Sequence, residues 1–387
     1  MKKFLALLMA TAMSALALTG CGESSAKADE NAVNIGVLAP TTGGVAVYGQ
    51  ACYNAFMLAA EERNANGGVL GKQINLMHQD DEGDITKAVN AYNKLAGDGV
   101  CAILGGITSK PTIAVARTIA NSNKPLPMMT PTATAADVTT FGDTVYKACF
   151  NDPYQGEVMA NYAKEVLGFK SVAVLYDIED DYSLGTAEAF KETAEKIGLT
   201  VPAFESFNGQ ATVDFKAQLT SINGKKPDAV FVPSYYNVIA LIMTQARNDV
   251  GIEVPFIGCD GWDGVLKVLE ENEKSVADGV IFSSHYFMED ENPVVANFVS
   301  SYRDKFGEDP SSFSALSYDA AMMLFDAIEK AGSEDSEAIV KALSETDYTG
   351  VTGHIHYNAG SQDPIKSLTM LKIENGMYKL VENYSID

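Results

Sequence analysis

Short apolar runs alternate with amphipathic segments along most of the chain, and this alternation indicates the fold class. In the first half, the pattern predicts strands at 33–39, 74–77, 100–104 and 126–130, with helices at 47–65, 85–96 and 111–120. After a break at 151–153, it predicts strands at 172–176, 200–205, 229–232, 256–258 and 279–283, with helices at 185–197, 213–222 and 238–247. Apolar strands separated by helices are typical of parallel sheets with crossover connections. We therefore predict an α/β protein with two units of similar size.

The C-terminal part of the chain departs from this alternation. Three helices are predicted in succession, at 293–306, 312–331 and 334–343. Strands follow at 352–357 and 367–381, the second with a turn at Asn375-Gly376. The local pattern alone does not assign these elements to either unit.

The N-terminus carries the pattern of an export signal. Lys2 and Lys3 precede an apolar run over 4–18, and the sequence Leu18-Thr19-Gly20-Cys21 completes the segment. The run is shorter than the roughly 20 residues that span a bilayer, which is typical of a signal peptide. The last four residues resemble a bacterial lipobox, which implies removal of 1–20, lipidation of Cys21 and a tether over 21–31. We expect an exported protein, lipid-anchored to the outer face of the cytoplasmic membrane, or periplasmic in a two-membrane cell.

The charge of the chain excludes one class of partner. There are 28 lysine and arginine residues against 51 aspartate and glutamate residues, which gives a formal net charge of −23. Nucleic acids and anionic lipid surfaces are polyanions and repel such a protein. No nucleic acid is therefore expected as a partner.

The residues that could catalyse a reaction or bind a metal form no motif in the sequence. Four cysteines lie far apart in apolar segments, at Cys52, Cys101, Cys149 and Cys259. We expect buried free thiols there, rather than disulfides or a zinc site. His354 and His356 share one face of a predicted strand, and an exposed face is expected rather than a metal pair. Because the sequence has no nucleophile elbow, His-Glu-x-x-His motif or P-loop, we predict no enzyme, metal or cofactor.

The loops that follow the predicted strands share a chemistry. Ligands of open α/β sheets bind beyond the carboxyl ends of the strands. In the first unit these positions are 40–44, 105–109 and 130–134, which are rich in hydroxyl groups and glycine, and in the second they are 180–182, 234–236 and 260–262, which supply aromatic rings and carboxylates. Taken singly, such loops more often cap helices or close turns. Together they suit a zwitterion, with hydroxyl and amide groups for its carboxylate and an aspartate for its ammonium group.

Four segments resemble the branched-chain amino-acid-binding proteins of bacterial ABC importers, and the likeness covers nearly the whole chain after residue 31. The segments are 35–43 (IGVLAPTTG), 66–72 (NGGVLGK), 130–134 (TPTAT) and 245–247 (QAR). The resemblance implies a type I periplasmic-binding fold, with two Rossmann-like lobes joined by a three-crossover hinge. It divides the chain into 32–150 plus 284–352 and 151–283 plus 353–387. It also implies a free amino acid as ligand, a membrane permease as partner, no cofactor and a monomeric state.

The resemblance also implies roles for particular residues. Ser109 and Thr134 match the residues that bind the ligand carboxylate, and Asp260 matches the acid that pairs with the ammonium group. Thr132 matches a position that accepts from the ammonium group through its backbone carbonyl. The complete set of expected ligand contacts is Tyr48, Ser109, Thr132, Ala133, Thr134, Tyr182, Tyr235, Asp260 and Trp262.

Two departures from the family pattern leave the ligand open. Tyr182 is followed by Ser183 where relatives commonly have glycine, and Trp262 stands where many relatives have a smaller residue. The tryptophan either reshapes the side-chain pocket or packs behind its loop. Leucine, isoleucine and valine are the expected ligands. Aromatic or polar amino acids, amides, urea and aromatic acids remain alternatives, as does a ligand-sensing role.

Overall fold

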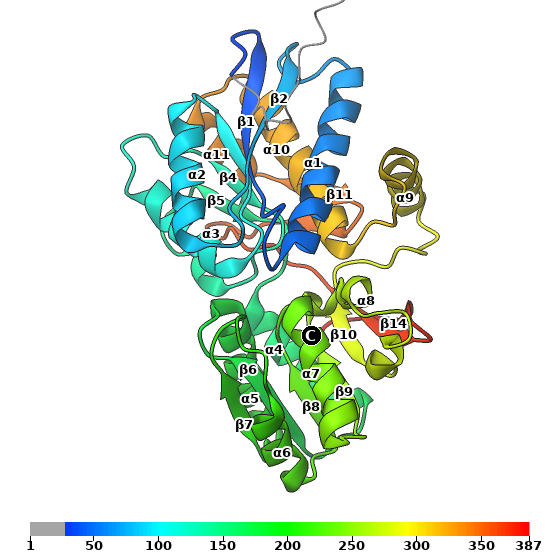
Figure 1. Cartoon of the computed structure of the whole chain (residues 1–387). Coiled ribbons are helices and arrows are strands. Elements are labelled where there is room, and N and C mark those ends of the chain that lie inside the picture. Colours follow the sequence, from blue (N-terminus) through cyan, green and yellow to red (C-terminus); the bar gives the residue numbers. More distant parts are fainter. Residues whose placement is uncertain (1–27, 387) are drawn as a thin grey trace, which may run out of the picture.

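The computed structural model describes residues 28–386 as two lobes, each built around its own sheet (Figure 1). The predicted signal peptide, the lipidation site Cys21 and most of the predicted tether lie outside the described residues. Lobe 1 is here the body around a five-stranded sheet, and lobe 2 is the body around a seven-stranded sheet. The prediction of two Rossmann-like α/β lobes is confirmed.

The sheet of lobe 1 is parallel throughout. Its strands in spatial order are β2 (Gln73–Gln79), β1 (Ala32–Leu38), β3 (Ala102–Gly105), β4 (Met128–Thr130) and β5 (Val145–Lys147). Every residue of β1 is buried, which is why that strand reads as an unbroken apolar run. Strand β5 was missed in the sequence because it is short and ends in Lys147, so it is not a continuous apolar run.

Helices cover both faces of this sheet (Figure 1). They are α1 (Ala46–Ala65), α2 (Ile85–Gly97), α3 (Ser109–Ala120), α9 (Pro293–Phe306), α10 (Ser312–Ala331) and α11 (Ser336–Ser344). Helix α1 packs against α10, and α2 packs against α3. The three late helices thus return to lobe 1, a placement that depends on contacts distant in sequence.

Lobe 2 combines parallel strands with a C-terminal antiparallel hairpin. Its strands in spatial order are β14 (Met377–Tyr384), β13 (Leu368–Glu374), β10 (Ile281–Ser284), β9 (Phe256–Gly258), β8 (Ala229–Val232), β6 (Val172–Asp177) and β7 (Phe204–Phe207). The hairpin turns at Asn375-Gly376, as predicted, and β13 runs antiparallel to β10. The helices of lobe 2 are α4 (Asp152–Asn161), α5 (Asp181–Ile197), α6 (Lys216–Lys225), α7 (Tyr236–Thr244) and α8 (Val265–Val268).

Helix α4 begins at the break in the sequence pattern at 151–153, where no helix was predicted. The side chain of Asn151 caps its start by accepting from the amide of Tyr154 at 3.0 Å. Pro153 lies in the first turn, where its missing N–H costs nothing. The same residues that mark the break therefore start a helix at the junction of the lobes.

The chain passes between the lobes three times: after β5, after β10 and before β13. Strands β11 (Asp347–Gly350) and β12 (Gly353–His356) form a separate antiparallel pair. Beyond it, the hydroxyl of Tyr357 donates to the carbonyl of Lys147 in β5 at 2.7 Å. Residue 357 is therefore still attached to lobe 1, so these contacts indicate a last passage later than Gly353. The division of the chain into lobes stays a prediction.

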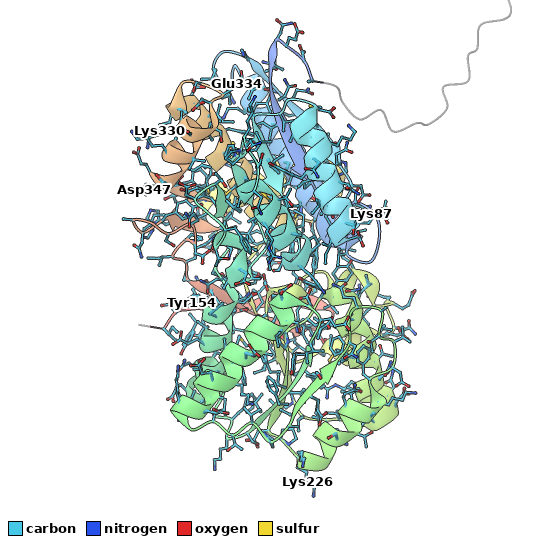
Figure 2. All side chains as sticks on the ribbon, turned by 90° about the vertical axis from the view of Figure 1, so that its left-hand side faces the viewer. Lys87, Tyr154, Lys226, Lys330, Glu334 and Asp347 are labelled. Atoms are coloured by element: carbon cyan, nitrogen blue, oxygen red, sulfur yellow. The ribbon has the colours of Figure 1, made fainter. Side chains whose placement is uncertain are left out.

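Other sequence features have clear places in the structure. The four cysteines within the described residues are free and buried, as predicted. Over 28–386, no helix has the length and apolarity required to span a bilayer, and no cluster of three or more His, Cys, Asp or Glu side chains suits a metal ion. His354 is exposed and pairs with Asp347 at 2.6 Å. Charged side chains spread over the outer surface of both lobes, for example at Lys87, Glu334 and Lys226 (Figure 2).

Candidate functional site

The carboxyl end of β3 brings a helix start close to the neighbouring strand. Gly105 has a φ of +117°, and a Cβ there would lie 2.0 Å from the carbonyl oxygen of Leu38 in β1. Only glycine permits this approach. The turn places Ser109 as the first residue of α3, almost fully buried, where its Oγ accepts from the amide of Ala135 at 3.1 Å. The start of α3 therefore faces the loop that follows β4.

That loop, Thr130–Thr134, is fixed by its own hydroxyl groups. The hydroxyl of Thr132 donates to the carbonyl of Ile107 at 2.7 Å, and the hydroxyl of Thr130 accepts from the amide of Ala133 at 3.2 Å. Thr134 is buried, and its carbonyl accepts from the amide of Asp152 at 3.1 Å. The predicted carboxylate-binding residues thus lie together at one edge of lobe 1, where the chain crosses to lobe 2.

Asp260 lies across from them on lobe 2. It opens a 3₁₀ turn, Asp260–Trp262, directly after β9. Its backbone amide donates to Oε1 of Gln155 in α4 at 3.3 Å, and its Oδ2 contacts Nε2 of His285 at 3.4 Å. Its Oδ1 is buried and has no hydrogen-bond partner among the described residues. Asp260 therefore presents one free carboxylate oxygen in a site from which water is excluded.

His285 supports this carboxylate without neutralising it. The ring is fully buried and stacks on Phe150 with centroids 3.8 Å apart. Burial lowers the pKa of His285 to about 4, against the opposing effect of Asp260. The imidazole is therefore neutral at pH 7, and its Nε2 must carry the proton that faces the carboxylate. A neutral His285 therefore adds no positive charge that would compete with a cation for Asp260.

Three tyrosines gather at the junction of the lobes near Gly261, and one of them, Tyr48, reaches it from lobe 1. Tyr48 of α1 donates its hydroxyl to the carbonyl of Gly261 at 2.5 Å, and the hydroxyl of Tyr182 accepts from the amide of Gly261 at 3.1 Å. Tyr182 stacks on Tyr235 with centroids 5.1 Å apart, and Tyr48 stacks on Phe313 at 3.9 Å. Burial raises the pKa of Tyr48, Tyr182 and Tyr235 well above the usual value, so all three are neutral. They form apolar walls with polar tips.

Further contacts hold the lobes together over this site. The Nζ of Lys110 in α3 donates to the carbonyl of Glu179 at 2.5 Å. The hydroxyl of Tyr236 donates to the carbonyl of Gly44 at 3.0 Å and accepts from the amide of Val47 at 3.2 Å. The structure is therefore a closed arrangement, with the candidate site buried between the lobes.

Trp262 packs into lobe 2. Its indole N–H donates to the carbonyl of Val232 at the end of β8 at 2.8 Å, and the side chain is fully buried. Gly258 provides the space, because a Cβ there would lie 1.9 Å from the indole nitrogen. The indole N–H of Trp262 is thus already hydrogen-bonded within the protein. A ligand contact through its ring stays a prediction.

This packing predicts a specific sensitivity at Gly258. Gly258→Ala is expected to lower the free energy of unfolding by about 1–3 kcal/mol, since the methyl group must displace the indole. The matched control is Gly224→Ala in α6, where a Cβ meets no atom within 4 Å. That change is expected to stabilise by about 0.5–1 kcal/mol, because alanine is the better helix former. Urea denaturation compares the two, and equal stabilities would contradict the packing described.

The structure also brings in residues that the sequence analysis missed. Asp152 and Gln155, one helical turn apart on α4, are buried at the junction of the lobes, as is His285 after β10. The Oε1 of Gln155 accepts both from Asp260 and from the hydroxyl of Ser283, the latter at 3.1 Å. The missing signal for Asp152 is strand β5: residues that follow a strand are candidate ligand contacts, and the chain leads from β5 to the start of α4.

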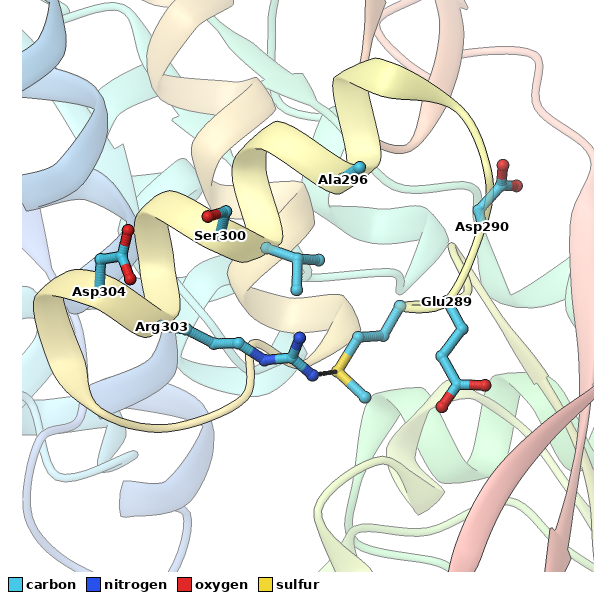
Figure 3. A pocket seen from close by; sticks show the side chains of 8 residues that line it. Glu289, Asp290, Ala296, Ser300, Arg303 and Asp304 are labelled. Carbon is cyan, nitrogen blue, oxygen red and sulfur yellow. Dashed lines mark hydrogen bonds between the residues drawn. The ribbon is translucent and has the colours of Figure 1, made fainter.

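Two surface pockets lie away from this site. One, of about 340 Å³, is lined by residues 296–304 of α9 and by the segment 288–290 before it (Figure 3). Its arginine, Arg303, is already bound to Asp309 at 2.5 Å and contacts the sulfur of Met288 at 3.6 Å. The other, of about 550 Å³, lies at the end of α1 beside Glu329. Neither pocket is lined by the buried polar groups without hydrogen-bond partners that lie between the lobes.

Comparisons with known proteins identify the family and the fold of the chain. Residues 32–377 match the periplasmic binding protein family. The chain is 32% identical over 354 residues to the Leu/Ile/Val-binding protein BraC3 of Rhizobium johnstonii, which covers 89% of this chain and 92% of that relative. Its structure is similar to that of a leucine-binding protein, LivK, from Thermotoga maritima, with a TM-score of 0.83, 34% identity and coverage of 91% and 99% of the two chains. It is also similar to the branched-chain amino acid transporter substrate-binding protein LivJ from Streptococcus pneumoniae, solved in complex with isoleucine, with a TM-score of 0.81, 31% identity and coverage of 91% and 99%.

Proposed function

This chain belongs to the periplasmic binding protein family, and on that premise we propose that it is the extracytoplasmic substrate-binding component of an ABC importer for leucine, isoleucine or valine. One observation carries the proposal. Asp260, a buried carboxyl group with one oxygen that lacks a partner among the described residues, lies beside Gly261, which binds Tyr48 of lobe 1 and Tyr182 of lobe 2. The names of the similar proteins support an aliphatic amino acid as the ligand.

The two ends of the site suit the two charges of an amino acid. The ligand carboxylate binds at the start of α3 and the loop after β4, where Ser109 and Thr134 offer hydroxyl and amide groups. The positive end of the helix dipole favours an anion there. The ammonium group pairs with Asp260, and the tyrosine rings cover an apolar side chain. Because closure excludes water, each of these interactions is stronger than in the open form.

Ligand binding is coupled to closure of the two lobes, and closure of the lobes is coupled to delivery of the ligand to the permease. The open protein binds the ligand on lobe 1, and lobe 2 then closes over it through contacts such as the one between Tyr48 and Gly261. The closed form is favoured only to the extent that the ligand binds it better than the open form. The closed protein then docks on a membrane permease and releases the ligand as the lobes open. We propose that it acts as a monomer, performs no catalysis and is held near the permease by a lipid on Cys21.

Thermal unfolding in the presence of single ligands tests this function. A ligand that binds only the folded protein stabilises it by mass action, by about 4 kcal/mol at a thousand times its Kd. Leucine, isoleucine or valine is expected to raise the melting temperature clearly, whereas D-leucine serves as the matched control. If no α-amino acid shifts the transition but an aromatic acid does, the amino-acid assignment is wrong.

A further inference from the structure

Lys147 is a buried cation beside the loop that is expected to bind the ligand carboxylate. It is the last residue of β5, an edge strand of the sheet of lobe 1 (Figure 1), and its side chain is 0% exposed. Its Nζ donates to the carbonyl of Ala135 at 2.7 Å and to the carbonyl of Thr134 at 3.3 Å. Neither the strand-end loops nor the resemblance in the sequence pointed to this residue.

Asp363 is the carboxylate that pairs with Lys147. Its Oδ1 lies 3.1 Å from the Nζ of Lys147, and its side chain is 24% exposed. The same carboxylate accepts from the hydroxyl of Thr139 and from the side-chain amide of Asn151, both at 3.1 Å. Burial of an ion pair is costly, and apolar side chains of similar volume are often at least as stable in its place. Stability alone is therefore a weak reason for a cation at this position.

A chain of hydrogen bonds leads from Lys147 to Ser109. The carbonyl of Thr134 and the amide of Ala135 belong to one peptide group, which accepts from Lys147 at one end and donates to the Oγ of Ser109 at 3.1 Å at the other. Because the Oγ of Ser109 accepts in this bond, the O–H of Ser109 remains as a donor. Hydrogen bonds in a chain polarise one another, so a cation at its start strengthens the donor at its end. The hydroxyl of Ser109 is thereby prepared to bind an anion.

The charge of Lys147 also reaches the junction of the lobes. Burial raises the pKa of Asp152 well above its usual value, the charges of Asp260 and Asp180 add to this rise, and the charge of Lys147 opposes it. A ligand carboxylate that enters among these acidic side chains is repelled by any that are ionised. A buried positive charge offsets this repulsion strongly, because the effective dielectric constant is low where water is excluded.

We propose that Lys147 is a positioning residue for the ligand carboxylate, which acts through the peptide group between Thr134 and Ala135 to orient and polarise the hydroxyl of Ser109. The proposal rests on the proposed function and adds to it a buried cation that does not touch the ligand. A ligand without a carboxylate gains little from a strengthened donor or from a positive charge. Lys147 therefore contributes to the selection of amino acids over amines that lack the carboxylate.

Leucine and leucinol test this role, because leucinol keeps the ammonium group and the side chain but has a hydroxymethyl group in place of the carboxylate. Titration calorimetry on the full chain compares both ligands for the wild type, Lys147→Met and the control Lys124→Met. Lys124 is an exposed lysine of the same lobe. Lys147→Met is expected to weaken leucine binding roughly 10- to 100-fold, the range for partners that orient the ligands of a metal site.

Leucinol is expected to bind Lys147→Met and the wild type alike, and Lys124→Met is expected to leave both affinities unchanged. Where leucinol binds too weakly for calorimetry, its effect on the melting temperature is followed at rising concentration, since the stabilisation depends on the ratio of ligand concentration to Kd.

The two ligands distinguish positioning from simple structural support. If Lys147→Met loses leucine and leucinol by the same factor, or binds leucine as the wild type does, Lys147 does not act on the ligand carboxylate. If the wild type binds none of leucine, isoleucine and valine, the proposed function fails and this inference fails with it. Melting of the ligand-free variant provides the folding check. If Lys147→Met does not fold, the double variant with Asp363→Asn replaces it, because that change leaves no uncompensated charge, and the same comparison decides.

Discussion

Replacement of Asp260 with alanine is expected to abolish most of the affinity for leucine, isoleucine and valine. Under the proposed function, the change removes the buried carboxyl group that pairs with the ammonium group of the ligand. Removal of one partner from a buried, hydrogen-bonded ion pair costs about 2–5 kcal/mol, which corresponds to a loss of roughly 30-fold to several thousand-fold. Titration calorimetry at neutral pH measures the loss directly.

Glu270→Ala is the control for Asp260→Ala. Glu270 is an exposed acid of the same lobe, ten residues further along the chain, and its removal is expected to leave the affinity unchanged. Asp260→Asn separates charge from shape, because the amide keeps the size of the side chain. If Asp260→Ala binds leucine with the affinity of the wild type, Asp260 does not belong to the ligand site.

Replacement of Asp319 with alanine is expected to cause a large loss of stability. This side chain of α10 is fully buried and accepts from the amides of Val351 and Thr352, both at 2.8 Å, and from the hydroxyl of Thr352 at 2.7 Å. The ammonium group of Lys366, which donates to the same threonine hydroxyl at 2.6 Å, stabilises the negative charge of Asp319. Removal of Asp319 leaves several buried donors and a buried cation uncompensated, at an expected cost of about 3–5 kcal/mol.

The same helix offers the comparison for Asp319→Ala. Asp326 forms an ion pair with Arg63 at the surface, where its side chain is 54% exposed. Asp326→Ala is therefore expected to change the free energy of unfolding by no more than about 1 kcal/mol. Urea denaturation of both variants in the absence of ligand provides the measurement. Equal losses would mean that the Asp319 network does not stabilise the segment that leads into the last passage between the lobes.

The Asp319 network and the Asp260 site have separate effects, one on the stability of lobe 1 and the other on closure of the lobes. The Asp319 network holds residues 351 and 352 to α10 of lobe 1, independently of any ligand. Closure buries the carboxyl groups of Asp260 and Asp152. Burial and the charge of Asp260 raise the pKa of Asp152 well above its usual value. Under the proposed function, the ammonium group of an amino acid compensates Asp260 as the lobes close.

Most of the fold could be predicted from local patterns. Strands β8 and β9 and helices α9 and α10 were predicted with the bounds observed, because each is a complete run of one periodicity. Strand β7 lies later than predicted, at Phe204–Phe207, because pairing with β6 selected its residues rather than their apolarity. Helix α4 was missed because it starts with Asn-Asp-Pro, and strand β5 was missed because its residues, Val-Tyr-Lys, are not a continuous apolar run.

Some residues of the candidate site could likewise be predicted from the sequence, and others could not. The resemblance carried by segments 35–43, 66–72 and 130–134 is confirmed by the family match, whereas the roles it implied for Ser109, Thr134 and Asp260 stay predictions. Reading the loops after strands located residues of both lobes, because parallel strands end at one edge of a sheet. It did not locate Asp152, which follows the missed strand β5, or His285, because the loop after the predicted strand at 279–283 was not among the loops expected to bind ligand.

The sequence by itself determined the alternation of strands and helices, the presence of two α/β units and the family to which the chain belongs. These depend on periodicity and motifs, which are local properties. Only the tertiary structure decided that Trp262 donates to Val232, that His285 supports Asp260 and that Asp152 shares its site. The physical reason is that burial and hydrogen-bond partners depend on tertiary contacts: Trp262 and Val232 are 30 positions apart and His285 and Asp260 are 25 apart, and the sheet of lobe 2 brings them together. No local pattern records which buried carboxylate is left without a partner.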